Sequence, residues 1–372
     1  MIYLDHASHT IVDEAVLSAF CQAARAHYAY PSQAHEVGRR TKQELDETTA
    51  DLAALLGVLP TEIIYTSGAS ESNSLAIKGI AKYYAHKGRH ILSTCLEHPS
   101  VSGALATLHE TGYEIELLKI CPNGTIDLPH LISVLRSDTI LLCVSTVDSE
   151  LGAVQPLSQI AAVIAEFPNC HLHVDAAQAM GKLPIAMGGV STLAYSPHKF
   201  HGITGSGILI KREGIVLDPQ IHGGSGVTLY RGGTPTVALA IAGLTAFSIA
   251  LREQEARLAT VTQLRDYALE VLNGYPKVRI NSPTTGSPYL LNLSVTGIKA
   301  PIFQAALNQR GVYVSVKSAC ATDASPSRAV LGISGDRQNA LSSWRVSFCH
   351  LTALAEVDAF LHAFDEIYRE LA

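Results

Sequence analysis

The chain has 372 residues, enough to bury a large core and to form one large domain with a smaller one, or two comparable domains. Hydrophobic residues make up 47% of it and charged residues 16%, which indicates a folded globular protein and excludes a disordered one. The formal net charge of −6 argues against a nucleic-acid partner, because phosphate contacts need a basic surface. We therefore expect chemistry on a small molecule.

Seven cysteines are scattered along the chain, and no two of them form a C-x-x-C pair. This pattern predicts neither a disulfide framework nor a metal site. The first residues, M-I-Y-L-D-H, lack the charged and apolar regions of a secretory signal. The uncharged segment 237–251 is too short and too rich in alanine to span a membrane, so it predicts a buried helix. We expect a cytoplasmic protein with no membrane attachment.

An amphipathic helix is expected first, at residues 36–56, followed by strands that alternate with helices. The leucines at 45, 52, 55 and 56 form its apolar stripe, and Gly57 ends it. The candidate strands are residues 63–66, 90–94, 115–120, 139–147, 170–174, 192–196 and 206–210. Helical patterns between them cover residues 70–87, 99–110 and 156–166. Alternation of this kind predicts an α/β fold with a mainly parallel sheet and helices on both faces.

The second half of the chain has a different pattern. A long helical stretch follows Gly233 and reaches about Leu272, where N-G-Y-P ends it. After it we expect a strand at 289–295, a helix at 301–309, a strand at 344–348 and a helix at 353–371. We therefore predict a large α/β domain over residues 14–250, and a small α+β domain made of residues 1–13 and 251–372.

The first motif with chemical meaning is S-G-A-S-E-S-N at residues 67–73, directly after a strand. Gly68 permits a tight turn, and the hydroxyl of Ser70 can cap the next helix. Exposed N–H groups and the helix dipole then form a phosphate seat. A plain capped helix is the alternative. The spacing fits neither a dinucleotide fingerprint nor a Walker loop, which disfavours a nucleotide enzyme.

The second motif is H-V-D-A-A-Q at residues 173–178, at the carboxyl end of a strand. The carboxylate of Asp175 can hold a protonated ring nitrogen, which makes a pyridine ring an electron sink. Gln178 can reach the same ligand. The alternatives for Asp175 are a metal ligand or a cap for the next helix.

The third motif is S-P-H-K-F-H-G at residues 196–202, again after a strand. A lysine in such a turn is well placed for a Schiff base, because burial lowers its pKa and frees the amine. Ser196 and His198 flank Lys199 and can bind phosphate. An exposed lysine without a role is the alternative. The order and spacing of the three motifs are more specific than any one of them.

With these motifs the chain resembles the cysteine desulfurases, in the class V aminotransferase group of fold type I pyridoxal-phosphate enzymes. The resemblance runs almost end to end. Its further motifs are L-D-H-A-S at 4–8, E-H-P-S-V at 97–101, V-D-A-A-Q-A-M-G-K-L-P at 174–184, H-G-G at 222–224, R-G-G-T at 231–234, S-A-C at 318–320 and W-R-V-S at 344–347. It implies the cofactor pyridoxal 5′-phosphate (PLP), bound by the large domain.

The resemblance implies a role for each matching residue near the cofactor ring. Lys199 would form the Schiff base with PLP, and Asp175 would pair with the pyridine nitrogen. Gln178 would contact the ring oxygen. His98 would stack on the ring and shuttle a proton. Ser149 stands where the family usually has an asparagine that touches the ring oxygen, so we expect a contact through water.

The resemblance also implies the residues that bind the phosphate and the substrate. The phosphate would be seated by Ala69, Ser70, Ser196 and His198. Thr234 would reach the phosphate of a neighbouring subunit, which makes the protein a homodimer. Arg345 would clamp the carboxylate of L-cysteine through its planar fork.

Cys320 lies in the polar stretch S-A-C-A-T-D-A-S-P-S-R, whereas the other six cysteines fall in helical or strand patterns. Buried cysteines of that kind act as small apolar residues. The position of Cys320 after S-A matches the sulfur-accepting cysteine of the family, in a loop of the small domain. A surface thiol without a role is the alternative.

Two further departures from the family concern partners. V-T-L at 227–229 replaces the usual acidic-basic pair before the R-x-G-T motif. The chain ends after its last helix, so we expect no C-terminal extension of the kind that docks a scaffold partner. A sulfur-acceptor protein, as in iron-sulfur cluster assembly, is implied by the resemblance without being identified.

The main hypothesis is a desulfurase that turns L-cysteine into L-alanine and leaves a persulfide on Cys320. The second is a PLP-dependent β-lyase, acting on cysteine, cystine or selenocysteine, or an aminotransferase, in which Cys320 is incidental. The third is a non-catalytic partner protein that keeps the pocket. The presence of Lys199, Asp175 and Arg345 disfavours the third.

Overall fold

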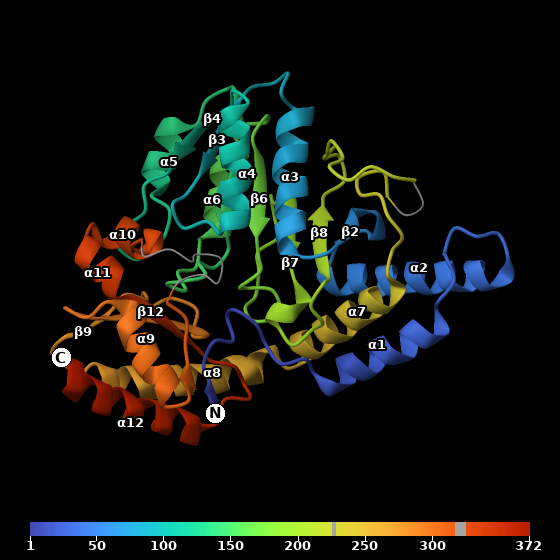
Figure 1. Ribbon diagram of the computed structural model, residues 1–372. Helices are drawn as coiled ribbons and strands as arrows, with labels where there is room; N and C mark the ends of the chain where they lie inside the picture. The colour runs from blue at the N-terminus through green and yellow to red at the C-terminus, as the bar shows by residue number, and fades with distance from the viewer. Residues whose placement is uncertain (225–227, 317–324) are drawn as a thin grey trace.

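A seven-stranded sheet forms the centre of the fold in this computed structural model, which describes residues 1–224, 228–316 and 325–372 (Figure 1). The strand order is β2-β8-β7-β6-β5-β3-β4. The strands are β2 Ile63–Thr66, β3 His90–Ser93, β4 Glu114–Leu117, β5 Thr139–Ser145, β6 His171–Asp175, β7 Thr192–Tyr195 and β8 Gly207–Lys211. Only β8 runs antiparallel to its neighbours, and the remaining pairs are parallel. The predicted mainly parallel α/β sheet is confirmed.

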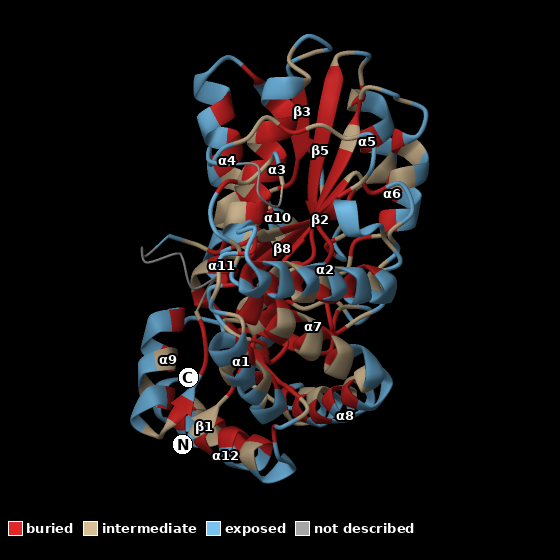
Figure 2. Cartoon of the chain, turned by 90° about the vertical axis from the view of Figure 1, so that its right-hand side faces the viewer, coloured by how far each residue is buried: buried red, intermediate tan, exposed pale blue. Residues whose placement is uncertain are grey.

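Helices cover both faces of this sheet because successive strand residues point to opposite sides. On β5, Leu141 and Cys143 pack with helices α3 (Ala69–Tyr83) and α4 (Pro99–Glu110). Leu142 and Val144 join the opposite cluster. That cluster includes residues of α1 Glu14–Ala26, α2 Glu36–Leu56, α5 Leu128–Val134, α6 Leu157–Ile164 and α7 Val237–Arg252. In Figure 2 the inner strands β3 and β5 are buried, while the outer faces of the helices are exposed. The edge strand β4 is only partly covered.

A separate hydrophobic core lies in the C-terminal part of the chain. It contains Trp344, which stacks on Phe303 with ring centroids 5.2 Å apart, together with Phe360 and Phe364. Its elements are α8 Gln254–Leu272, β9 Val278–Ile280, β10 Leu290–Val295, α9 Ala300–Gln309, β12 Ser343–Ser347 and α12 Leu354–Leu371. The N-terminal strand β1 (Ile2–Tyr3) pairs with β11 (Val312–Tyr313) beside it. Helices α10 Arg328–Ser334 and α11 Arg337–Ser342 pack in a smaller cluster with Leu151 and Ala153. The exact domain boundaries stay a prediction.

Two local expectations are wrong, and one helix was not predicted. The long helical stretch after Gly233 is two helices, α7 and α8, bent by 67° at Glu253. Helix α1 was not among the predicted elements, although its apolar residues have helical spacing and Asp13 caps its first turn. On α2, Leu45 and Leu52 are buried, but Leu55 is 40% exposed and lies off the apolar stripe.

Helix α7 covers the apolar segment 237–251, and eight of its residues are buried, as predicted. No single helix among the described residues is long and apolar enough to cross a membrane. The bent pair α7 and α8 passes that test only when the two are counted together, by length and composition alone.

The turn after β2 packs directly against Gly207, the first residue of β8. This contact leaves no room for a side chain at position 207. A Cβ atom on Gly207 would lie 2.4 Å from the Cα atom of Gly68. Gly68 is also the N-cap of α3. This contact therefore fixes where α3 begins relative to the sheet.

Gly207→Ala should lower the free energy of unfolding by about 1–3 kcal/mol, because the new methyl group must displace backbone. Urea denaturation measures this change. The matched control is Gly103→Ala in α4, where a Cβ would meet no atom within 4 Å. The control should be neutral, or stabilising by up to about 1 kcal/mol. Equal stability of the two variants would contradict the packing argument.

Candidate active site

A cavity of about 330 Å³ lies at the carboxyl ends of β2, β5, β6 and β7. In open α/β sheets, ligands bind at this edge. Most of the predicted site residues line the cavity, namely Ala69, Ser70, His98, Ser149, Asp175, Gln178, Ser196, His198, Lys199 and Arg345. The structure therefore brings together residues that come from both halves of the sequence.

Lys199 ends a short 3₁₀ turn, Pro197–Lys199, that follows β7 directly. Proline fixes the backbone at the start of this turn. The ammonium group of Lys199 donates hydrogen bonds to the carbonyl oxygens of Ala7, at 2.9 Å, and Ser8, at 2.7 Å. The amine is thus held between the sheet edge and the N-terminal segment.

Asp175 is the last residue of β6, and its carboxylate is oriented by α3. Oδ2 accepts a hydrogen bond from Asn73 Nδ2 at 2.8 Å, and Oδ1 accepts one from the backbone N–H of Ala177 at 2.9 Å. Asn73 Oδ1 lies 3.0 Å from His173 Nε2, so His173 must donate from Nε2. Burial lowers the pKa of His173 to about 3, so its ring is neutral near pH 7. Nδ1 of the neutral ring then accepts from the hydroxyl of Thr192, at 2.9 Å.

His98 caps helix α4 from the rim of the cavity. Its Nδ1 accepts a hydrogen bond from the backbone N–H of Ser100 at 3.1 Å. Burial lowers the pKa of His98, and the nearby carboxylate of Asp175 opposes this effect. Burial also raises the pKa of the preceding Glu97 to about 7, although Ser145 and Thr94 donate hydrogen bonds to it. An imidazole that is neutral near pH 7 can both accept and donate a proton.

The start of α3 lines the cavity where the phosphate is expected to bind, but Ser70 does not cap the helix. Ser70 lies inside the helix, and the N-cap is Gly68, which has no side chain to cap with. The N–H of Ala69 instead donates to Ser196 Oγ, at 2.6 Å. Burial lowers the pKa of His198 to about 4, and its buried Nδ1 has no hydrogen-bond partner among the described residues.

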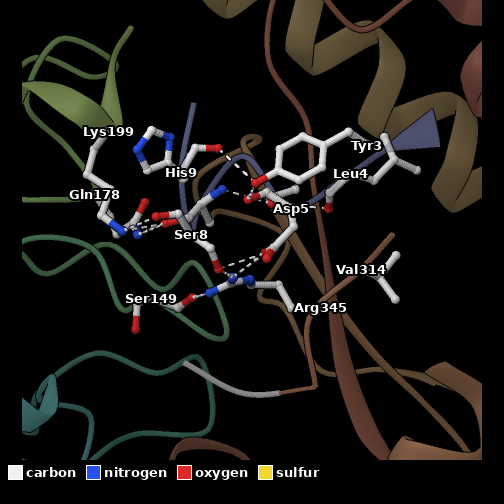
Figure 3. A network of polar contacts seen from close by, with 12 residues as sticks. Tyr3, Leu4, Asp5, Ser8, His9, Ser149, Gln178, Lys199, Val314 and Arg345 are labelled. Carbon is white, nitrogen blue, oxygen red and sulfur yellow. Dashed lines mark hydrogen bonds and ion pairs between the residues drawn. The ribbon is translucent and has the colours of Figure 1, made fainter. Parts of the chain in front are cut away.

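Arg345 enters the cavity from β12 and is 2% exposed. Its Nη2 donates to Asp5 Oδ1 at 2.7 Å and lies 2.9 Å from Ser8 Oγ, while Nη1 donates to the carbonyl oxygen of Ser149 at 2.6 Å (Figure 3). Ser149 therefore contacts Arg345 through its main chain. Three acceptors hold the guanidinium plane in one orientation.

One described residue of the predicted site, Thr234, does not line this cavity. Thr234 lines a neighbouring cavity of about 110 Å³, which shares Ser67 and Gly205 with the main one. Cys320 falls in 317–324 and lies outside the described residues.

Four residues of the site were missed from the sequence. Asn73 was inside a motif already noted, one helical turn after Ala69, and that spacing was the available signal. Asp5, Ser8 and Ser100 also lie inside noted motifs but act on residues far away in the sequence. Away from the cavity, His90, Glu114 and Glu116 lie close enough to hold a cation, so the expectation of no metal stays a prediction.

Comparison with known proteins assigns the family. The sequence pattern of class-V aminotransferases matches residues 2–360. Cysteine desulfurase IscS of Dictyoglomus turgidum is 32% identical over 100% of this chain and 95% of its own. The IscS enzyme of Neisseria meningitidis serogroup C is 35% identical over 96% of this chain and 89% of its own. The chain belongs to the cysteine desulfurase family.

The fold of this cysteine desulfurase family member also matches solved structures. A NifS-like protein superposes with a TM-score of 0.93 at 29% identity, and each chain is covered completely. SspA in complex with cysteine superposes with a TM-score of 0.82 at 28% identity, over 95% of this chain and 100% of that one. The fold type I class is therefore confirmed.

Class-V aminotransferases and cysteine desulfurases are PLP-dependent enzymes, and the residues of the cavity fit this cofactor. The cavity has the volume of a small-molecule site. A carboxylate, Asp175, and an amine, Lys199, line it together. The buried Nδ1 of His198, which has no partner in the described part of the chain, suits a phosphate oxygen.

Stability should fall as the pH is lowered from 7 to 5, and His173 contributes to this fall. Its pKa of about 3 in the folded chain lies below the value of about 6.5 in the unfolded chain. The stabilisation is present above pH 6.5 and is lost as the unfolded state takes up a proton. His173 alone should account for about 2 kcal/mol over this range.

Urea denaturation at several pH values measures the effect, with His173→Gln as the comparison. Glutamine does not titrate, so the variant should lose less stability than the wild type between pH 7 and 5. Parallel curves for the two proteins would show that folding does not change the pKa of His173.

Proposed function

We propose that this chain is a PLP-dependent cysteine desulfurase that converts L-cysteine to L-alanine and takes the sulfur onto Cys320 as a persulfide. One observation carries the proposal: Lys199, Asp175, His98 and Arg345 line a single cavity. PLP, when bound, supplies an electron sink for negative charge at the substrate α-carbon. Its family relatives named cysteine desulfurase support the choice of substrate.

Lys199 would hold PLP as a Schiff base and then move the α-proton of the substrate. When the substrate amine takes the place of Lys199 on PLP, the freed lysine amine needs hydrogen-bond acceptors. The carbonyl oxygens of Ala7 and Ser8 supply them, at 2.9 and 2.7 Å. An amine held there stays beside the cavity, where it can take and return a proton.

Asp175 would hold the pyridine nitrogen in its protonated form, which the hydrogen bond from Asn73 favours by fixing the carboxylate. Gln178 would donate to the ring oxygen. Ala69, Ser70, Ser196 and His198 would seat the phosphate. The neutral imidazole of His98 would lie over the ring and shuttle a proton.

Arg345 would bind the substrate carboxylate. Its guanidinium group is buried and oriented by Asp5, Ser8 and the carbonyl of Ser149. A planar group that is already oriented loses little entropy when it forms a bidentate pair.

The sulfur transfer would use the thiolate of Cys320 as nucleophile. A bond forms between its sulfur and the substrate sulfur while the carbon–sulfur bond breaks. The β-carbon of the substrate, which has lost its sulfur, then takes a proton, and the product is alanine. A persulfide on the enzyme would then pass its outer sulfur to an acceptor protein, as in iron-sulfur cluster assembly.

We also propose a cytoplasmic homodimer in which Thr234 contacts the phosphate bound by the partner subunit. Thr234 lies outside the main cavity of its own chain, in the adjoining one. In the same loop, Arg231 forms an ion pair with Glu71 of α3, at 2.7 Å. This pair would anchor the loop beside the phosphate end. A PLP-bound monomer in solution would contradict the dimer.

Lys199→Ala should abolish the visible absorbance band of the PLP-bound protein, because no Schiff base to the enzyme can form. In the wild type, borohydride reduction and peptide mapping should place the label on Lys199. A colourless wild-type protein, or a label on another lysine, would sink the assignment.

Cys320→Ala should keep the visible band and substrate binding, because neither depends on this thiol. Release of alanine from L-cysteine should fall by at least about 100-fold, as when a covalent nucleophile is lost. Mass spectrometry of wild-type protein after brief cysteine treatment should find one added sulfur on the Cys320 peptide. Alanine and sulfide are assayed together, with a reductant present.

The matched control is Cys121→Ala, which removes another free thiol, between β4 and α5. It should keep the full rate. Pyruvate and ammonia as products, with the full rate retained in Cys320→Ala, would instead establish the β-lyase.

A further inference from the structure

Lys182 is a buried lysine next to the active site for which no role has been given so far. It lies one turn after Gln178, in the tight connection that follows β6, and is 6% exposed. Gly181 makes this turn possible, because its φ of +72° favours glycine. A Cβ there would also lie 2.8 Å from the ring of Phe200. The backbone therefore delivers Lys182 to a fixed place under the cavity.

The surroundings of Lys182 are cationic or neutral. The charged and titratable groups facing it are Lys199 after β7, Arg345 on β12, Cys349 beyond it, and the histidines His6, His198 and His201. Its ammonium also lies over the ring of Tyr289, 5.6 Å from the centroid. Burial lowers the pKa of Lys182 to about 7, and Lys199 and Arg345 act in the same direction.

The hydrogen bond of Lys182 goes to a residue of the cavity. Its Nζ donates to Gln178 Oε1 at 3.0 Å, and Gln178 Nε2 donates to the carbonyl oxygen of Ala7 at 2.9 Å. Both ends of the amide are thus fixed. Reversing the amide would place its NH₂ group against Lys182 and its oxygen against the carbonyl of Ala7.

We propose that Lys182 is a positioning residue, which orients the Gln178 amide so that the cavity presents an N–H donor to the PLP ring oxygen. The inference rests on the proposed function, in which Gln178 contacts that oxygen. A donor at this place stabilises the ionised ring oxygen, because a hydrogen bond to a charged form favours that form. Without Lys182 only the carbonyl of Ala7 orients the amide, and the N–H donor is held less firmly toward the ring oxygen.

The experiment is a double-mutant cycle on the PLP-bound protein with Lys182→Met, Gln178→Met and the double variant. The readout is the pH midpoint of the titration of the visible band, together with the dissociation constant of PLP measured on the apoprotein. Lys182→Met should raise the midpoint by about 0.5–1 pH unit, the size expected for one lost hydrogen bond. In the Gln178→Met background the same change should add almost no shift.

Lys211→Met is the matched control, because Lys211 is also 6% exposed and also lies over an aromatic ring, that of Tyr230, at 4.9 Å. Lys211 bonds to carbonyl oxygens of Arg212 and Ile215, away from the cavity, so its variant should titrate like the wild type. Thermal unfolding shows whether the two variants are equally stable. If Lys182 only supports the fold, two equally stable variants should have the same pH midpoint.

Two outcomes would overturn the proposal. One is a Lys182→Met midpoint equal to that of the wild type. The other is an equal shift in both backgrounds, which would mean that Lys182 acts through its charge and not through Gln178. A wild type without any visible band would instead refute the proposed function. If Lys182→Met does not fold, Lys182→Gln, which is polar but one atom shorter, takes its place and the same cycle decides.

Discussion

The hydrogen bonds from Lys199 and Arg345 to the N-terminal segment are the interactions on which the site depends. Ala7 and Ser8 offer carbonyl oxygens to Lys199, while Asp5 and Ser8 offer side-chain oxygens to Arg345. The segment is itself fixed by Ser347, whose Oγ accepts from the N–H of Ala7 at 2.9 Å. A few residues thus join the sheet and the C-terminal core at the point where the chemistry takes place.

Three basic side chains lie close together at the site. Lys199 and Arg345 lie close enough to Lys182 to lower its pKa, and Arg345 forms an ion pair with Asp5. Burial keeps the neighbouring His6, His198 and His201 neutral, since it lowers the pKa of each to about 4. Basic side chains beside neutral imidazoles suit the carboxylate and the phosphate of the ligands.

Much of the fold was predictable, because strands and helices alternate with clear turn residues between them. The cavity residues were predictable where a short motif held them, as with Asp175 and Lys199. Residues joined by tertiary contacts were not, since Asp5 and Arg345 are 340 positions apart in the sequence. The bend at Glu253 was missed for a similar reason: neither glycine nor proline marks it, and packing on two different cores separates α7 from α8. The role of Ser149 through its carbonyl could not be predicted either, because a main-chain atom leaves no trace in residue type.

The pairing of Asp5 with Arg345 has a consequence for how the protein forms during synthesis. The lysine turn and the sheet edge emerge from the ribosome well before β12 does. The N-terminal segment must therefore wait until the nascent chain has grown past Arg345 and the C-terminal core has begun to form. Closing so long a loop comes late in folding. The entropy that the chain loses is offset only by the contacts that form when Asp5 and Arg345 meet. Capture of PLP in its finished geometry is then a sign that the whole polypeptide has reached its native state.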